Sequence, residues 1–158
     1  MGNRAVITLK SKDKPDLGVY LHWCGDRDQV EAFLLYCELK SYRSPDEDCY
    51  GWARLAQTIA NYFDNGLSIG INLCCYLDCN NGDNGVYEIE GWKIVGRKFC
   101  GRDHYGLKYY GFLQFLKDIN AAQPEKVQLP NGILEDAARR FFSEHLSDPD
   151  NPYADYLS

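Results

Sequence analysis

The stretch SYRSPDEDCYGWARLAQTIANYFDNG, residues 41–66, contains signals that both start and stop a helix. Ser44 can cap the N-terminus, the proline after it suits the first helical position, and Glu47 can reach back to the cap. The helix is expected either to run as one piece or to restart at Asp48. It stops at Gly66, because glycine tolerates the left-handed conformation. Its inner face is apolar and consists of Trp52, Leu55, Ile59, Tyr62 and Phe63.

Another helix is predicted directly before this one, over residues 28–41. Asp28 and Glu31 match a capping box. The apolar side chains that follow have the spacing of one buried helix face: Val30, Phe33, Leu34 and Cys37. Further upstream, the β-branched segments 4–9 and 18–23 predict two strands joined as a hairpin. Two helices therefore follow two strands in succession.

The second half of the chain predicts three more strands and two more helices. Segment 67–73 alternates with period two, and segments 86–89 and 92–95 flank a tight turn. Helical spacing returns at 109–122 and around 133–142. The order ββαα-βββ-αα lacks the strand–helix alternation of a parallel sheet. It predicts an α+β fold in which helices cover one face of a mainly antiparallel sheet of about five strands.

Length and composition favour one globular unit. The 158 residues are 45% hydrophobic and 25% charged, which excludes disorder over most of the chain. We expect residues 1–146 to form a single domain and residues 147–158 to be an acidic, flexible tail. No apolar run reaches the roughly 18 residues of a membrane span, and no secretory h-region is visible. The expected location is the cytoplasm, away from membranes.

The net charge of −6 is unevenly distributed along the chain. Residues 46–92 hold eight acidic side chains and one basic one, a poor match for phosphate backbones but a good one for a basic protein. We therefore expect a basic protein partner. The residues predicted to contact it are Asp46, Glu47, Asp48, Asp78 and Asp83. The alternative is that the acidic surplus serves solubility alone.

Residues 93–117 have the opposite character, with six basic side chains and one acidic one, interleaved with aromatic residues. Such a mixture can grip a single nucleic-acid strand by charge and stacking. The residues that would bind nucleic acid or another anion are Arg97, Lys98, Arg102, His104 and Lys108. On an acidic chain, these cations are expected instead to pair internally or to face water, so nucleic acid is the less favoured partner.

Seven cysteines in a chain without an export signal indicate reduced thiols. Cys75 and Cys79 could form one ligand pair with Cys74 beside them, but a structural zinc site usually needs two such pairs. We expect no metal and no cofactor, with a metal on these three thiols as the alternative. The loop from Asp78 to Gly85 lacks the glycine and glutamate positions of an EF-hand, so it predicts turns.

The turn after His22 offers an alternative function. It joins a strand end to a helix N-terminus, where backbone N–H groups can bind an anion. A small enzyme or a nucleotide-binding domain could use it, and Cys24, His104 and Asp103 could be drawn as a catalytic set. No hydrolase, zinc-protease or phosphate-loop motif is present. A helix cap is the favoured interpretation, and we do not expect an enzyme.

Three short stretches carry a resemblance. Asn3–Thr8, Val19–Trp23 and Tyr50–Leu55 are similar to segments of small uncharacterised proteins from bacterial phages and integrative mobile elements. The resemblance implies a bacterial cytosolic setting, and it brings no activity or site residues. Proteins of that kind often inhibit host nucleic-acid-handling defence enzymes, as anti-CRISPR or anti-restriction factors. Together with the charge pattern, this gives the expectation of an acidic protein-binding domain that acts as an accessory or inhibitor.

Overall fold

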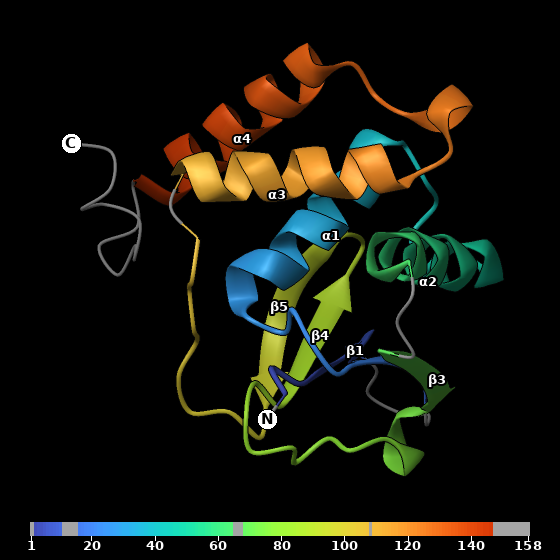
Figure 1. The fold of residues 1–158 in the computed structure, drawn as a ribbon. Helices are drawn as coiled ribbons and strands as arrows, with labels where there is room; N and C mark the ends of the chain where they lie inside the picture. Colours follow the sequence, from blue (N-terminus) through green and yellow to red (C-terminus); the bar gives the residue numbers. More distant parts are fainter. Residues whose placement is uncertain (1, 11–15, 65–67, 108, 147–158) are drawn as a thin grey trace.

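In the part of the chain that the structure describes, five strands form one sheet in the order β3-β2-β1-β4-β5 (Figure 1). The computed structural model describes residues 2–10, 16–64, 68–107 and 109–146, so the predicted tail at 147–158 lies outside the described residues. Each strand is short and rich in β-branched or aromatic residues, as a half-buried pleated surface requires. The strands are β1 (Ala5–Leu9), β2 (Leu17–Leu21), β3 (Ile69–Leu73), β4 (Val86–Glu90) and β5 (Lys93–Lys98).

The sheet is mixed, which corrects the expectation of a mainly antiparallel one. Strand β2 is antiparallel to both β1 and β3, and β5 is antiparallel to β4. The central pair differs, because β1 and β4 run parallel with Val6 opposite Val86. The chain leaves β3 at one end of the sheet and crosses beneath the sheet through residues 74–85. It then enters β4, which lies between β1 and β5, and it does so at the opposite strand ends from those where it left β3. Because the crossover runs back along the strands, β4 is parallel to β1.

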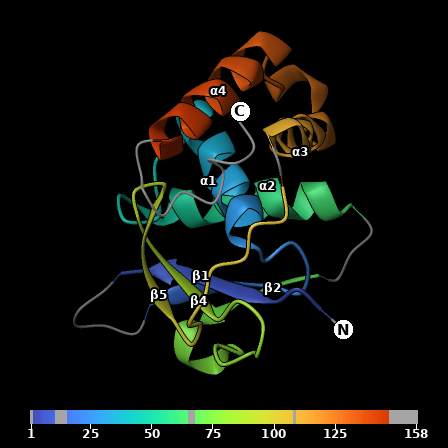
Figure 2. The same ribbon diagram turned by 90° about the vertical axis from the view of Figure 1, so that its left-hand side faces the viewer.

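Within the described residues, four α-helices lie on one side of the sheet, which confirms the α+β class (Figure 2). Helices α1 and α2 are nearest the strands, α3 packs on both of them, and α4 packs on α3. Their bounds are α1 (Arg27–Leu39), α2 (Cys49–Phe63), α3 (Tyr109–Ala122) and α4 (Asn131–Leu146). The observed order differs from the predicted one by two short 3-10 helices, η1 (Cys74–Tyr76) and η2 (Glu125–Val127). Across the described ranges, no helix is long and apolar enough to cross a bilayer.

Helix α2 begins later than its first possible start. Asp48 is the N-cap, and its carboxylate accepts a hydrogen bond from the Tyr50 N–H at 3.0 Å. Upstream, Glu47 does reach back and accepts from the Ser44 N–H at 2.7 Å, but this closes a separate turn. The α2 backbone packs closely against that turn, since a Cβ on Gly51 would lie 2.2 Å from a Ser44 backbone atom. Of the two alternatives, a restart at Asp48 is the one observed.

The main core lies between the sheet and the helices. Alternate strand residues such as Ile7 and Val19 face it and are fully buried. Two buried tyrosines satisfy their hydroxyls inside it, as buried polar groups must. The Tyr87 hydroxyl donates to the Gly25 carbonyl at 2.6 Å, and the Tyr36 hydroxyl donates to the Asn120 side chain at 2.9 Å. Helices α1 to α4 also contribute to the core, for example through Phe33, Leu55, Ile59, Phe112, Leu116 and Phe142.

The crossover of residues 74–85 covers part of the opposite face of the sheet (Figure 2). Asn81 organises its second half, because its side-chain oxygen accepts from the N–H groups of Asp83 and Gly85, both at 3.0 Å. The Asn81 amide donates to the Asp78 carbonyl at 3.1 Å. These are the contacts of a turn, in agreement with the predicted turn at 78–85.

Candidate functional site

The five predicted protein-binding carboxylates fall into two groups at opposite ends of β4. Asp46 accepts from the N–H of Gly91, which follows β4, and Glu47 and Asp48 are its neighbours. Asp83 lies before β4 and is paired with Arg4 at 2.7 Å, while Asp78 lies 3.7 Å from the same guanidinium. Their charges are thus partly used in caps and ion pairs. The structure does not gather them into one surface.

The predicted basic residues are divided in the same way. Arg97 pairs with Asp103 at 2.8 Å and stacks on the Tyr87 ring, with 3.6 Å from the guanidinium carbon to the ring centroid. Lys98, the next residue along β5, is directed to the opposite face of the sheet and lies 3.6 Å from Glu88. Arg102 and His104 are exposed in the segment that follows, and Lys108 lies outside the described residues. Arg97 therefore has an internal role.

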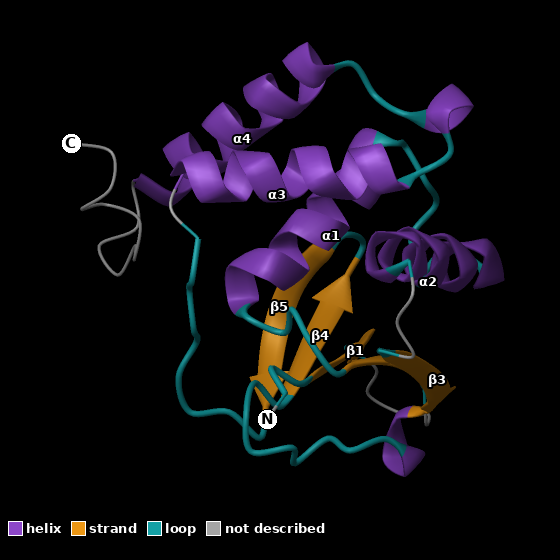
Figure 3. Ribbon diagram, in the orientation of Figure 1, coloured by secondary structure: helices purple, strands orange, loops and turns teal. Residues whose placement is uncertain are grey.

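The segment 99–107 crosses the side of the molecule from β5 to α3 without regular secondary structure (Figure 3). Asp103 fixes its middle, because its carboxylate lies between two guanidinium groups, at 3.0 Å from Arg27 and 2.8 Å from Arg97. Asp28, which is fully buried, accepts a hydrogen bond from the N–H of Leu107. Burial raises the pKa of Asp28 to about 6. These carboxylates attach the segment to the start of α1.

Contacts between the segment 99–107 and the start of α1 also occupy the turn after His22. The backbone N–H groups that an anion would need at the start of α1 are already occupied, by the Gln29 side chain, the His104 carbonyl and Asp28. Burial raises the pKa of the Cys24 thiol to about 11, which makes it a weak nucleophile at neutral pH. Asp103 pairs with arginines, as described above. The geometry therefore gives no support to nucleotide binding or to a catalytic set at this turn.

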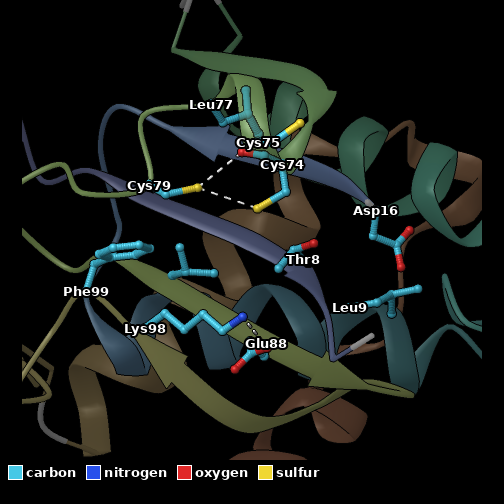
Figure 4. Close-up of a pocket in the computed structure, with 11 residues that line it drawn as sticks. Thr8, Leu9, Asp16, Cys74, Cys75, Leu77, Cys79, Glu88, Lys98 and Phe99 are labelled. Atoms are coloured by element: carbon cyan, nitrogen blue, oxygen red, sulfur yellow. Dashed lines mark hydrogen bonds and ion pairs between the residues drawn. The ribbon is translucent and has the colours of Figure 1, made fainter. Parts of the chain in front are cut away.

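A cavity of about 400 Å³ opens on the face of the sheet that the helices leave free (Figure 4). Phe99 and the thiols of Cys74 and Cys79 border it, and the side chains of Lys98 and Glu88 lie across from the thiols (Figure 4). Lys98 and Glu88 supply an ion pair between them. The remaining lining residues are Thr8, Leu9, Asp16, Cys75, Leu77 and Val86. The cavity is mostly apolar, and its two carboxylates outnumber its one ammonium.

The three neighbouring cysteines do not share one position. The Sγ atoms of Cys74 and Cys79 are 3.5 Å apart, whereas Cys75 is exposed. Within the described ranges, no three cysteine, histidine or carboxylate side chains converge as metal ligands would. Cys74 and Cys79 therefore form a pair of adjacent thiols without Cys75, and this pair lies at the end of β3.

Strand β3 is an edge of the sheet, and it exposes aliphatic side chains. Ile71 is 53% exposed, and Leu73 and the cross-strand Leu17 are each 37% exposed. Tyr76 of η1, three residues beyond the strand, is 72% exposed. We call Leu17, Ile71 and Leu73 the β3 patch. A cluster of apolar side chains on a sheet edge is typical of an interaction site.

The backbone of β3 also faces outward at these residues. The His22 N–H donates to the Ser68 carbonyl, and the Cys74 N–H donates to the Asp16 carbonyl. Hydrogen-bonded pairs alternate along an antiparallel ladder, so Gly70 and Asn72 also bond to β2. The polar backbone groups of Ile69, Ile71 and Leu73 therefore point away from the sheet. The Leu73 N–H is already bonded to the Asn72 side chain at 2.8 Å.

The opposite edge of the sheet is built differently. Strand β5 carries Lys93, Arg97 and Lys98 among its six residues, and a bulge interrupts its pairing with β4. Charges and bulges on an edge strand discourage pairing with another chain. Strand β3 has neither feature in its sequence Ile-Gly-Ile-Asn-Leu. Of the two edges, β3 is the one suited to accept a further strand.

No protein-family model, curated protein or solved structure matches this chain. Sequence reasoning did not single out the β3 patch or the paired thiols. The signal for the patch was present in the uncharged alternation of 69–73. Its edge position follows from the path of the chain, which local patterns do not contain. The contact between Cys74 and Cys79 depends on how the loop between them is wound.

Proposed function

We propose that this chain is a protein-binding domain that accepts an extended strand of its partner along β3. The observation that carries the proposal is the outward backbone of Ile69 and Ile71 beside the exposed aliphatic side chains of the β3 patch. In binding by strand addition, main-chain hydrogen bonds supply affinity and alternate side chains supply specificity. Strand β3 offers both on the same residues.

The partner segment can be described by its chemistry. Since β3 carries no charge, a strand with alternating aliphatic side chains fits it best, with one row packed on Ile71 and Leu73. Outside that segment, the acidic balance of this domain favours a partner of positive net charge. The roles of inhibitor or mobile-element accessory, and a host defence enzyme as the partner, stay predictions from the resemblance.

The test is a selection of short peptides from a display library on the purified domain, followed by affinity measurements by calorimetry. Ile71→Pro is the informative variant, because it removes an outward N–H while the ladder to β2 keeps its bonds; proline is tolerated on edge strands in that orientation. We expect selected peptides to alternate aliphatic residues and to bind Ile71→Pro about tenfold more weakly, or about 1.4 kcal/mol.

A matched pair of charged variants supplies the control. Ile71→Lys on β3 and Val95→Lys on β5 place the same charge on partly exposed positions at the two edges. Peptide binding should weaken in the first and stay unchanged in the second. The proposal is wrong if the selected peptides bind all three variants as tightly as the parent domain. Equal loss at Val95→Lys would likewise refute β3 as the site.

A further inference from the structure

The thiols of Cys74 and Cys79 are held together by the winding of the chain between them. The Leu77 N–H donates to the Cys74 carbonyl at 3.1 Å, and the Cys79 N–H donates to the Leu77 carbonyl at 2.8 Å. The Cys79 thiol also donates to the Cys74 carbonyl at 3.2 Å. These backbone contacts hold the two residues close together, and their sulfurs lie 3.5 Å apart.

Both sulfurs can be reached from solvent. They line the open cavity beneath the sheet, and each residue is partly exposed (Figure 4). Cys37 illustrates the other kind of cysteine, since it is fully buried in the core and directs its thiol to the Thr58 hydroxyl at 3.8 Å. A buried thiol of that kind is inert. The 74–79 pair combines proximity and access.

We infer that Cys74 and Cys79 are a reversible redox site, which forms an intramolecular disulfide by exchange with a low-molecular-weight disulfide. The sulfurs need to approach by about 1.5 Å more to reach bonding distance. Two thiols are oxidised to one disulfide, and one molecule of the small disulfide is reduced to two thiols, so electrons and protons balance.

The order of the two steps follows from the surroundings of the thiols. Burial, and secondarily the contact with Cys74, raises the pKa of Cys79 to about 12, so Cys79 supplies little thiolate at neutral pH. The Cys79 thiol also donates its proton to the Cys74 carbonyl at 3.2 Å, so the first attack is assigned to the other sulfur. Cys74, as its thiolate, attacks the small disulfide, forms a mixed disulfide and expels one thiolate. The Cys79 thiol then passes its proton to that thiolate, attacks the Cys74 sulfur and expels the second thiolate.

Closure of this bond would fix the end of β3 to the crossover. Cys74 is the first residue after β3, and Cys79 lies at the far end of the turn that carries Tyr76. The disulfide would tie this turn at both ends, beside the β3 patch and at the rim of the cavity. The conformational freedom of the segment that follows the edge strand β3 would therefore depend on the redox state of the surroundings.

The experiment incubates the full chain with mixtures of reduced and oxidised glutathione, blocks free thiols by alkylation, and maps the cysteines by mass spectrometry. We expect the Cys74–Cys79 bond at a ratio of oxidised to reduced glutathione about tenfold lower than oxidises the exposed Cys49. In Cys79→Ser, the first step should stop at a glutathione adduct on Cys74. Peptide mapping of the parent chain needs no variant, so a fold defect in Cys79→Ser does not remove the test.

Cys75→Ser is the matched control, because Cys75 is exposed and adjacent to Cys74. The bond between Cys74 and Cys79 should form in Cys75→Ser as it does in the parent chain. Oxidation of Cys49 at the same ratio as the pair would overturn the inference, and so would a disulfide that includes Cys75. These readouts report thiol chemistry alone, so their failure is distinct from a failure of peptide binding.

Discussion

Replacement of Asp103 by alanine should destabilise the fold more than the loss of an exposed ion pair does. The Asp103 carboxylate bridges Arg27 and Arg97, at 3.0 and 2.8 Å, and these two arginines come from α1 and β5. Alanine leaves two guanidinium groups without their shared counter-ion. It also removes one of the contacts that attach the segment 99–107 to the start of α1, while the Leu107 N–H to Asp28 bond remains. The effect therefore combines electrostatics with the loss of a long-range attachment.

The magnitude follows from burial. Removal of one partner of a fully buried pair costs about 3–5 kcal/mol, whereas surface pairs contribute about 0–1 kcal/mol. The side chains here are 27% exposed for Asp103, 21% for Arg27 and 14% for Arg97, so solvent screens the interaction in part. We expect Asp103→Ala to lower the free energy of unfolding by about 2–3 kcal/mol. Urea unfolding followed by circular dichroism measures this as a lower midpoint with an unchanged slope.

Asp136→Ala is the control for this prediction. Asp136 pairs with Arg139 at 3.2 Å on α4, and both side chains are more than 60% exposed. Its loss should change the free energy of unfolding by less than about 0.5 kcal/mol. If Asp103→Ala is as mild as Asp136→Ala, the bridge contributes nothing and the reasoning from burial fails.

Two further predictions concern a buried acid and a pair of glycines. Asp28 has a pKa near 6 in the fold, above its ordinary value of 3.8, so the folded state keeps a proton that the unfolded chain loses. The free energy of unfolding of the parent chain should fall by up to about 3 kcal/mol as pH rises from about 4 to 6, relative to that of Asp28→Asn. If urea unfolding gives the same pH dependence for both proteins, the prediction is wrong. Gly85 and Gly91 both have positive φ, but a Cβ on Gly85 would lie 2.3 Å from the Lys98 carbonyl oxygen, while one on Gly91 meets nothing within 4 Å. Thermal unfolding should therefore show a loss of more than about 2 kcal/mol for Gly85→Ala and about 1 kcal/mol for Gly91→Ala, and equal losses would exclude the clash as the cause.

The helices and strands could be predicted because their signals are local. The apolar spacing of residues 28–41 and the cap at Asp48 each depend on a few neighbouring residues, and both are found in the fold. The direction of β4 relative to β1 is not local. A five-residue strand has the same pattern in either direction, and the parallel pairing of Val6 with Val86 is set by the crossover beneath the sheet.

The site was harder to predict, because counts of charge along the chain ignore which way side chains point. Arg97 and Lys98 are adjacent in sequence, yet they lie on opposite faces of the sheet, one in an internal ion pair and one in the cavity. Asp46 and Asp83 belong to one acidic stretch, yet they lie at opposite ends of β4. Only the three-dimensional arrangement shows that β3, with no charge at all, is the exposed edge.

The parallel pairing of β1 with β4 has a consequence for synthesis on the ribosome. Strand β1 cannot pair with β4 until Val86, eighty positions after Val6, has been synthesised. Until then the β1–β2 hairpin lacks its neighbouring strand β4 on one side. Such distant pairing slows folding, so the nascent chain passes through a prolonged stage in which chaperones have an opportunity to bind it.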